Sequence, residues 1–425
     1  MTRPTSLPTH GVLIAAGQKH LDADNAAAAE LIARDVLSEN PTNADAMNLL
    51  GRCQLALGVP GFAAQSFEHA LRLNPYLKPA AKNLKRAQEA LAALPSHSSN
   101  PRYVIIREWM EGLWSDVDHV IGLCAFADAT GRLPIVHWGA QSRYRTSSPG
   151  NAWTELFEPV SAATIQQAAD QSSAIFPPRW TRDTLTGPIV GRWSGPHSRV
   201  SALTLLGRTE QTVVCDFHSG LSEMLPYMPP GHPLQGKPIV EARRIAVARY
   251  LRPVPAILKA VNEFQSAHFG PGPMLGVHLR GTDKVGEQPD LAAINSRYPA
   301  AIARHLSADP TMRMLLITDS QPFVEFCKNA YPGRVITTAA TRATDSVALH
   351  YMQGNHDRVA LGAEVLIDTL LASRCDRFIG LATSNVSLYV RDFKHWPPGT
   401  TEFFGEPIND RRNLYIKLCP PRPEA

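Results

Sequence analysis

The chain has 425 residues, of which 44% are hydrophobic and 19% charged, a globular composition with enough length for two or three domains. Its formal net charge of +4 is too small and too dispersed to indicate binding to nucleic acid or to a membrane surface. The six cysteines show no CxxC spacing, so we expect reduced, mostly buried thiols in place of a disulfide framework or a zinc site.

The first apolar run, residues 11–17, is short and is followed at once by Gln18, Lys19 and His20. This is too little for a signal peptide, and no run of 18 apolar residues occurs elsewhere in the chain. The sequence therefore predicts a cytoplasmic protein with no membrane span.

Residues 10–95 contain an internal repeat with a spacing of 34 residues. Gly17 pairs with Gly51, and Pro41 with Pro75. This period, with small residues where two helices touch and proline after the second helix, resembles the tetratricopeptide repeat. We therefore predict an all-α array over residues 1–95, closed by a capping helix at 77–94. Such a short array offers little groove, so packing on the rest of the protein or self-association is favoured over peptide binding.

A polar linker at 95–101 leads into a first α/β region, predicted as a lobe over residues 96–235. Strands are expected at 103–106 and 133–137, with a loop at 111–114 and a helix at 116–129 between them. The stretch from 137 to 240 is rich in tryptophan, proline and glycine. Acceptor contacts are expected there, although its aromatic side chains fit a core equally well.

The Asp116–Val117–Asp118 pattern is compatible with a divalent metal held over a diphosphate. Ser115 and Asp116 also stand where a helix N-cap is expected, and such acid pairs are frequent by chance. The capping interpretation is favoured, and no metal site is predicted.

A second α/β lobe is predicted over residues 236–395, followed by a proline-rich tail at 396–425. Its expected helices and strands alternate, as in a parallel sheet with crossover helices. The helices are expected at 239–251, 254–264, 297–306, 323–330 and 362–373, and the strands at 275–279, 314–317, 335–337 and 377–380.

Polar side chains cluster where the central strand of this lobe ends, and again after the next strand. They are His278, Arg280, Asp283 and Lys284, then Thr318 and Asp319. The carboxyl ends of parallel strands open into the crevice where α/β proteins bind ligands. An arginine can clamp two phosphate oxygens, which indicates a nucleotide diphosphate. From the residues alone, a structural ion pair that closes the turn is equally well supported.

Two further groups follow in the second lobe. Asp368 lies on a helix flanked by leucine and isoleucine, and Thr383, Ser384 and Asn385 follow the strand at 377–380. A buried carboxylate is costly unless it meets donors, such as the N1–H and N2–H₂ edge of guanine. Without further information, a structural aspartate that caps a turn is the favoured interpretation.

Two segments, GVHLRGTDKVGE at 276–287 and LIDTLLASRCDRFIG at 366–380, resemble the GDP-fucose-dependent fucosyltransferases. They are most similar to the core alpha-1,6 enzymes and the rhizobial Nod-factor enzymes, and the resemblance extends over about residues 101–392. It implies a GT-B-like fold with two Rossmann-like lobes, the first for the acceptor and the second for GDP-fucose. It further implies an inverting, metal-independent transfer of fucose to a glycan or other hydroxyl acceptor, with no cofactor.

The resemblance also implies roles for individual residues. Arg280 is expected to contact the diphosphate, and Asp368 to hold guanine or ribose. The remaining predicted substrate-binding residues are His278, Gly281, Thr282, Asp283, Thr318, Asp319, Thr383, Ser384, Asn385, Gly112 and His119.

Glu287 is the expected catalytic base, with Lys284 orienting it or supporting the phosphate. Two departures stand out: Gly281 replaces a second basic residue of the alpha-1,6 enzymes, and their proposed base lies one position later, at Gln288.

Three alternatives remain open at this stage. The donor could be another nucleotide sugar, because Arg280 recognises phosphate and not fucose. The chain could instead be a repeat-based adaptor with an inactive transferase domain, which Gly281 makes plausible. A Rossmann-type oxidoreductase is disfavoured, because no GxGxxG opens a βαβ unit.

Overall fold

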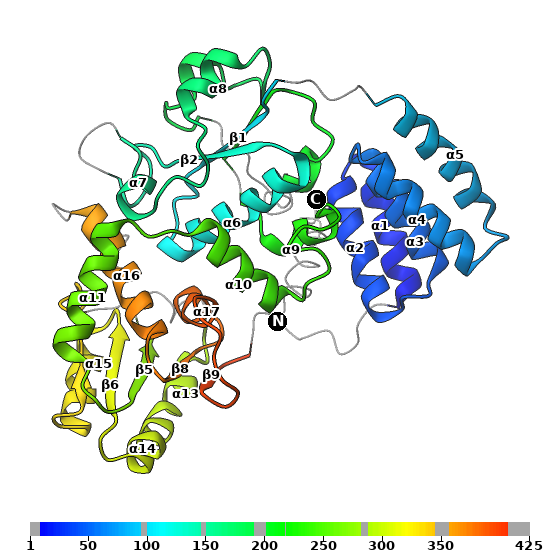
Figure 1. The fold of residues 1–425 in the computed structure, drawn as a ribbon. Coiled ribbons are helices and arrows are strands. Elements are labelled where there is room, and N and C mark those ends of the chain that lie inside the picture. The colour runs from blue at the N-terminus through cyan, green and yellow to red at the C-terminus, as the bar shows by residue number, and fades with distance from the viewer. Residues whose placement is uncertain are drawn as a thin grey trace, which may run out of the picture.

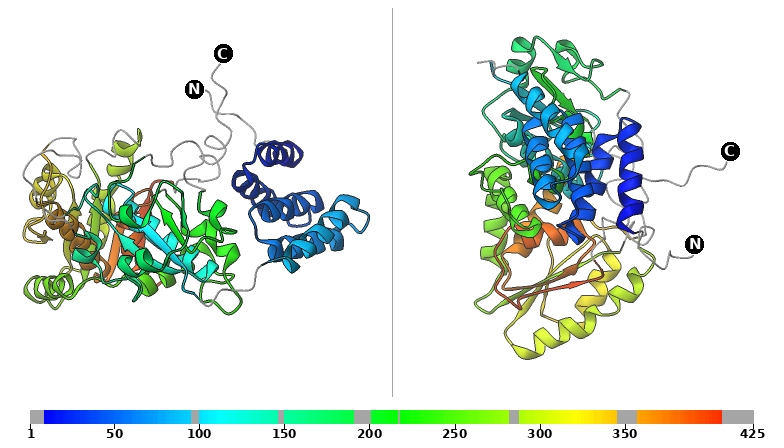
Figure 2. Two further views of the ribbon diagram at one scale, coloured as in Figure 1. Left: turned by 90° about the horizontal axis from the view of Figure 1, so that it is seen from above. Right: turned by 90° about the vertical axis from the view of Figure 1, so that its right-hand side faces the viewer.

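The computed structural model describes residues 9–94, 100–145, 150–190, 201–216, 218–281, 288–344 and 357–406. An all-α array comes first in the chain, followed by two α/β lobes (Figure 1). Seen from above in Figure 2, the array lies to one side of the pair of lobes.

The helical array has five helices: α1 (His10–Asp22), α2 (Ala26–Glu39), α3 (Ala44–Ala56), α4 (Pro60–Leu73) and α5 (Lys78–Ala92). The bounds of α1 and α2 recur 34 residues later in α3 and α4, the period found in the sequence. Gly51 shows why small residues recur. A β-carbon there would lie 2.6 Å from the ring of Phe67 on α4, so only glycine allows the two helices this close.

The array packs directly on the first lobe through Tyr227, the last residue of the 3₁₀ helix η3 (Leu225–Tyr227). The Tyr227 hydroxyl donates a hydrogen bond to the carboxylate of Glu30 on α2 (2.7 Å). Its ring meets the ring of Phe62 on α4 edge-on, with 5.1 Å between centroids. Packing of the array on the rest of the protein, one of the two favoured interpretations, is therefore observed; self-association stays a prediction.

The first lobe is built on a four-stranded parallel sheet in the order β2 (Leu133–His137), β1 (Tyr103–Arg107), β4 (Thr212–Cys215) and β3 (Ile175–Phe176). On one face it packs against α6 (Leu113–Thr130) and α9 (Leu221–Met224). The other face packs against α8 (Ile165–Gln171) and residues beside η1 (Arg182–Thr184). Helix α7 (Trp153–Leu156) and η2 (Ser201–Leu205) complete the elements of this lobe.

The second lobe is built on a five-stranded parallel sheet in the order β7 (Val335–Ile336), β6 (Arg313–Thr318), β5 (Met274–Leu279), β8 (Arg377–Leu381) and β9 (Thr401–Phe404). Helices α11 (Pro255–His268), α16 (Arg358–Ser373) and α17 (Asn385–Asp392) cover one face. Helices α13 (Leu291–Asn295), α14 (Tyr298–Ala308) and α15 (Gln321–Ala330) cover the other. The predicted α/β architecture of two parallel-sheet lobes behind an all-α array is thus confirmed.

Three local predictions differ from the structure. Residues 401–404, predicted as part of a tail, form β9 and pair with β8, so the second sheet extends beyond position 395. Helix α6 begins at Leu113 with Gly112 as its N-cap. Asp116 is therefore no N-cap: its carboxylate accepts the N–H groups of Met110 and Glu111 (3.2 and 2.9 Å) and so folds the preceding loop onto the helix.

The lobes meet through α6, α17 and the connecting helix α10 (Ile239–Tyr250). Arg243 on α10 pairs with Asp118 on α6 and, at 2.7 Å, with Asp392 on α17. Nearby, Trp114 stacks on Tyr389 of α17 with 4.2 Å between ring centroids. Apolar residues of the array and of both lobes join here in one continuous core.

Asp118 is thus paired with an arginine, and the described residues contain no group of three or more His, Cys, Asp or Glu side chains arranged to hold a metal. None of the helices in the described ranges combines the length and apolar character needed to cross a bilayer. The cytoplasmic location stays a prediction.

Candidate active site

Arg280 and Asp319 follow the adjacent strands β5 and β6, whose last residues, Leu279 and Thr318, are register partners. The Arg280 guanidinium pairs with the Asp319 carboxylate through Nη1 and Oδ2 (2.7 Å). The other oxygen of Asp319 accepts the N–H of Gly281 (3.1 Å). Asp319 therefore fixes both the side chain of Arg280 and the backbone that follows it.

Both side chains of this ion pair line a pocket of about 100 Å³ between the lobes, here called the interlobe pocket. The first lobe contributes Tyr144 and the second lobe the rest. The lining residues are Tyr144, His278, Arg280, Ile317, Thr318, Asp319, Ala340, Thr341, Leu361, Glu364, Val365, Asp368 and Val386. Five of the predicted site residues, from β5, β6 and α16, thus meet in one place.

His278 contributes to this pocket as a neutral side chain. It is almost fully buried, and its Nδ1 shares a hydrogen bond with the Ser387 hydroxyl on α17 (2.7 Å). Burial, reinforced by the neighbouring Arg280 cation, lowers the pKa of His278 to about 3. The imidazole thus positions the end of β5 and adds no positive charge for a phosphate.

Asp368 lies on α16, lines the same pocket and is 8% exposed. Its Oδ1 accepts a hydrogen bond from the Thr338 hydroxyl (2.6 Å). Burial raises its pKa to about 6, against the opposing effects of Thr338 and the Arg342 cation. Asp368 is therefore an acceptor-rich group, ionised at neutral pH, that faces a pocket.

Gly281 is packed too tightly to be replaced by a larger residue. A β-carbon there would lie 2.8 Å from the ring of Phe323 on α15 and 3.2 Å from Cβ of Ser320. The second basic residue of the alpha-1,6 enzymes has no room at this position. Among the described residues that line the interlobe pocket, Arg280 is the one cationic side chain.

The other predicted residues take different places. Thr383 bonds Gln288 through its hydroxyl (2.6 Å), Ser384 is the buried N-cap of α17, and Asn385 is the exposed first residue of that helix. None of the three lines the pocket, although the next residue, Val386, does.

Gly112 and His119 also lie away from the pocket lining. Gly112 caps α6, and His119 is fully buried beneath the sheet, where its Nε2 meets the carbonyl oxygen of Arg107 (3.2 Å). Thr282, Asp283, Lys284 and Glu287 lie outside the described residues, so their predicted roles stay predictions.

Several pocket residues were not anticipated from the sequence. Glu364 lies one helical turn before Asp368, a spacing that places both acids on the same face of α16 and could have identified it. Its Oε2 accepts the N–H of Thr341 (2.8 Å). No sequence pattern could have identified Tyr144 as a pocket residue, because it reaches the pocket from the first lobe.

Two parallel-sheet α/β lobes with a pocket between them place this chain in the class of GT-B-like proteins. No family model matches the chain. It is 27% identical over 358 residues to nodulation protein Z of Bradyrhizobium diazoefficiens, across 78% of this chain and 88% of that protein. This similarity agrees with the resemblance to the rhizobial Nod-factor enzymes that the sequence motifs indicated.

NodZ alpha-1,6-fucosyltransferase soaked with GDP-fucose superposes with a TM-score of 0.46 and 22% identity, over 69% of this chain and 93% of that one. POFUT1 in complex with GDP gives a TM-score of 0.40 and 15% identity, over 73% and 100%.

Proposed function

We propose that this protein transfers fucose from GDP-fucose to a hydroxyl group of a glycan or another acceptor. The observation that carries the proposal is the meeting of Arg280, Asp319 and Asp368 in the interlobe pocket. The sequence similarity to nodulation protein Z supports the same donor, since NodZ is an alpha-1,6-fucosyltransferase that has been soaked with GDP-fucose.

In this proposal different residues of the interlobe pocket bind the diphosphate and the guanine of GDP. Arg280, oriented by Asp319, binds the diphosphate through charge-assisted hydrogen bonds. The ionised Asp368 carboxylate accepts the N1–H and N2–H₂ donors of guanine. These donors favour the charged form of Asp368 and so offset the burial that raises its pKa.

The reaction itself is a single displacement. The acceptor oxygen attacks C1 of fucose on the side opposite the diphosphate, and the bond from C1 to the phosphate oxygen breaks, so the configuration inverts. GDP leaves with the bonding electron pair, and its growing charge is stabilised by Arg280. The acceptor proton passes to Glu287, the predicted base, which Lys284 orients. Because Arg280 provides the positive charge at the diphosphate, the proposed reaction is metal-independent and requires no cofactor.

The substitution Arg280→Ala tests this assignment. We expect the kcat/KM of GDP-fucose hydrolysis to fall by about 100- to 1000-fold, the usual cost of removing one transition-state donor. Arg304→Ala is the matched control, because that arginine is exposed on α14 and pairs with Glu402. Equal hydrolysis rates for wild type and Arg280→Ala would overturn the proposal. Tighter binding of UDP than of GDP would overturn the assignment of GDP-fucose as the donor.

The tight packing of Gly281 favours one second candidate, an adaptor whose transferase domain is inactive. In that case the wild type would neither hydrolyse nor transfer from GDP-fucose. A different sugar donor would instead show as faster turnover of GDP-mannose than of GDP-fucose. For the helical array we propose tetratricopeptide-like repeats whose first role is to cover the first lobe.

A further inference from the structure

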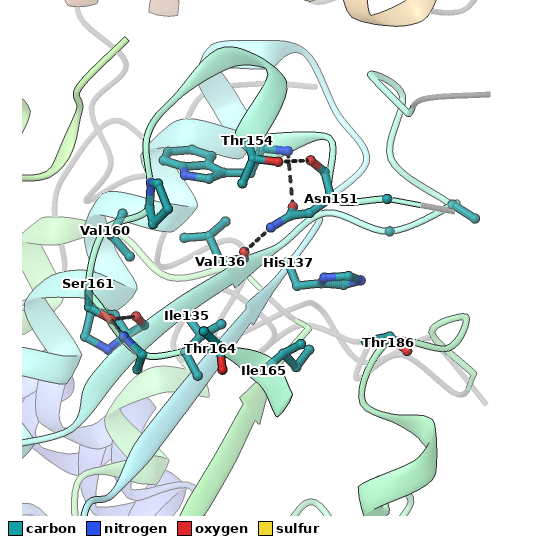
Figure 3. A pocket seen from close by; sticks show the side chains of 17 residues that line it. Ile135, Val136, His137, Asn151, Thr154, Val160, Ser161, Thr164, Ile165 and Thr186 are labelled. Atoms are coloured by element: carbon teal, nitrogen blue, oxygen red, sulfur yellow. Dashed lines mark hydrogen bonds between the residues drawn. The ribbon is translucent and has the colours of Figure 1, made fainter. Parts of the chain in front are cut away.

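A second pocket, of about 570 Å³, lies along β2 in the first lobe and is here called the β2 pocket (Figure 3). Its walls come from β2 itself, from the segment that follows it, and from residues around α7 and the start of α8. The lining residues are Pro134, Ile135, Val136, His137, Gly139, Ala140, Gly150, Asn151, Trp153, Thr154, Pro159, Val160, Ser161, Ala163, Thr164, Ile165 and Thr186.

The described lining of this pocket carries no charge at neutral pH. It contains no Asp, Glu, Lys or Arg side chain, and its one titratable group is His137 at the end of β2. Burial, together with the nearby Arg107 cation, lowers the pKa of His137 to about 4. A charged ligand would therefore lose its hydration without gaining an opposite charge, so the pocket selects against one.

The pocket is also unsuited to a peptide that adds a strand to the sheet, although β2 is an edge strand. Pro134 has no N–H, and its carbonyl oxygen already accepts the Ser161 hydroxyl (2.6 Å). The Val136 carbonyl accepts the Asn151 amide (2.7 Å), whose oxygen accepts the N–H of Trp138 (2.9 Å). Figure 3 shows the Asn151 and Ser161 bonds that close this edge.

The β2 pocket and the interlobe pocket are linked by one short segment. Gly139 and Ala140 line the first, and Tyr144 lines the second. The segment is folded back on itself, because the N–H of Ser142 bonds the carbonyl of Gly139 (3.0 Å) and Tyr144 is buried. Ala140 and Tyr144 are four residues apart, so their Cα atoms lie at most about 14 Å from each other, a separation that a ligand of several sugar units can span.

We propose that the β2 pocket binds an uncharged saccharide unit of the acceptor, an assignment that rests on the proposed function. The apolar walls, such as Pro134 and Ile165, contact the C–H face of the sugar, and the neutral His137 imidazole bonds one of its hydroxyls. The unit bound there positions a further hydroxyl of the same acceptor at the donor sugar. The acceptor is accordingly neutral where it contacts the first lobe.

The test fills the pocket from its exposed rim. Ala140→Trp and Thr154→Trp each place an indole at an exposed lining position, so one can replace the other if either variant fails to fold. Ala162→Trp is the matched control, because Ala162 is exposed between two lining residues and does not line the pocket. The probes are neutral cello-, malto- and N-acetylchito-tetraose, with tetragalacturonate as the charged counterpart.

For each variant, transfer from GDP-fucose to the probe is divided by hydrolysis of GDP-fucose. We expect at least one neutral tetraose to be a substrate or a ligand of the wild type in calorimetry, and tetragalacturonate to be neither. The rim variants should lower the transfer-to-hydrolysis ratio at least tenfold and weaken binding of the neutral tetraose equally, while Ala162→Trp changes neither by more than twofold. An unchanged ratio and unchanged binding in both rim variants would overturn the inference, as would preferred binding of tetragalacturonate. Failure of the proposed function is distinct, because it appears as hydrolysis that is insensitive to Arg280→Ala.

Discussion

If Asp368 recognises guanine, its contribution can be separated from that of the diphosphate with two nucleotides that differ by one amino group. Inosine diphosphate lacks the N2–H₂ donor of GDP and keeps the rest of the nucleotide. Asp368 is 8% exposed and retains a hydrogen bond from Thr338, so its contact with the N2 donor would be buried and charge-assisted. Such a bond contributes about 1.5–3 kcal/mol, or about 10- to 150-fold in affinity.

The perturbation is Asp368→Asn, which keeps the shape and the oxygen that accepts from Thr338 but removes the charge and one acceptor. We expect wild type to bind GDP about 10- to 150-fold more tightly than inosine diphosphate. In Asp368→Asn the two nucleotides should differ by less than about fivefold, because the asparagine cannot accept both donors of guanine. Calorimetry at pH 8, well above the pKa of about 6 of Asp368, keeps the wild-type carboxylate ionised.

The four dissociation constants form a double-mutant cycle. If Asp368→Asn weakens both nucleotides by the same factor, or neither, the carboxylate does not read the base. The companion variant Glu364→Gln distinguishes the two acids that line the pocket on α16. Should the coupling appear in Glu364→Gln and not in Asp368→Asn, the guanine would lie one helical turn away from the proposed position.

Three other outcomes follow from the same contacts. GDP affinity, measured by calorimetry, should fall more steeply in wild type than in Asp368→Asn as pH drops through about 6, because Asp368 protonates there in addition to the terminal phosphate of GDP. Burial raises the pKa of Glu223 from 4.5 to about 8, so its contribution to stability is complete below pH 4.5 and is lost as pH rises to 8. Glu223→Gln should accordingly raise the free energy of unfolding in urea by about 4 kcal/mol at pH 8 and hardly at pH 4.5; equal effects would refute the protonated state. Arg243→Met removes the arginine partner of Asp118 and leaves Asp392 paired with Arg391 alone, and it should cost about 3–5 kcal/mol in the same assay, whereas a loss below 1 kcal/mol would show that the bridge is not needed.

Much of the second lobe was predictable because its local signals agree with its tertiary environment. β5 and β8 are short apolar runs between turn formers, and they became the buried centre of the sheet. Once these strands are parallel, Arg280 and Asp319 must emerge at the same edge, so their proximity follows from topology. Asp368 was placed by the family resemblance, since its residue environment alone favoured a structural role.

The other features of the fold and of the site could not be predicted from the local sequence, because they depend on residues that are distant in the chain. Tyr144 becomes a pocket residue only when the first lobe meets the second. β9 follows a proline-rich stretch that predicts a tail, and its strand conformation comes from pairing with β8. Asp116 is a residue type that often caps helices. Here its carboxylate bonds backbone groups of the loop before α6, because the path of that loop brings them within reach.

The seam formed by Tyr227, Glu30 and Phe62 bears on how the catalytic half could be isolated. A truncated gene product starting after the linker at 95–101 would lose the contacts of Tyr227 with Glu30 and Phe62 and would expose apolar surface of the first lobe that is now buried. Such a fragment would be prone to aggregate on expression. The N-terminal repeats therefore form part of the protein's hydrophobic core, and the two lobes are not expected to be stable without them.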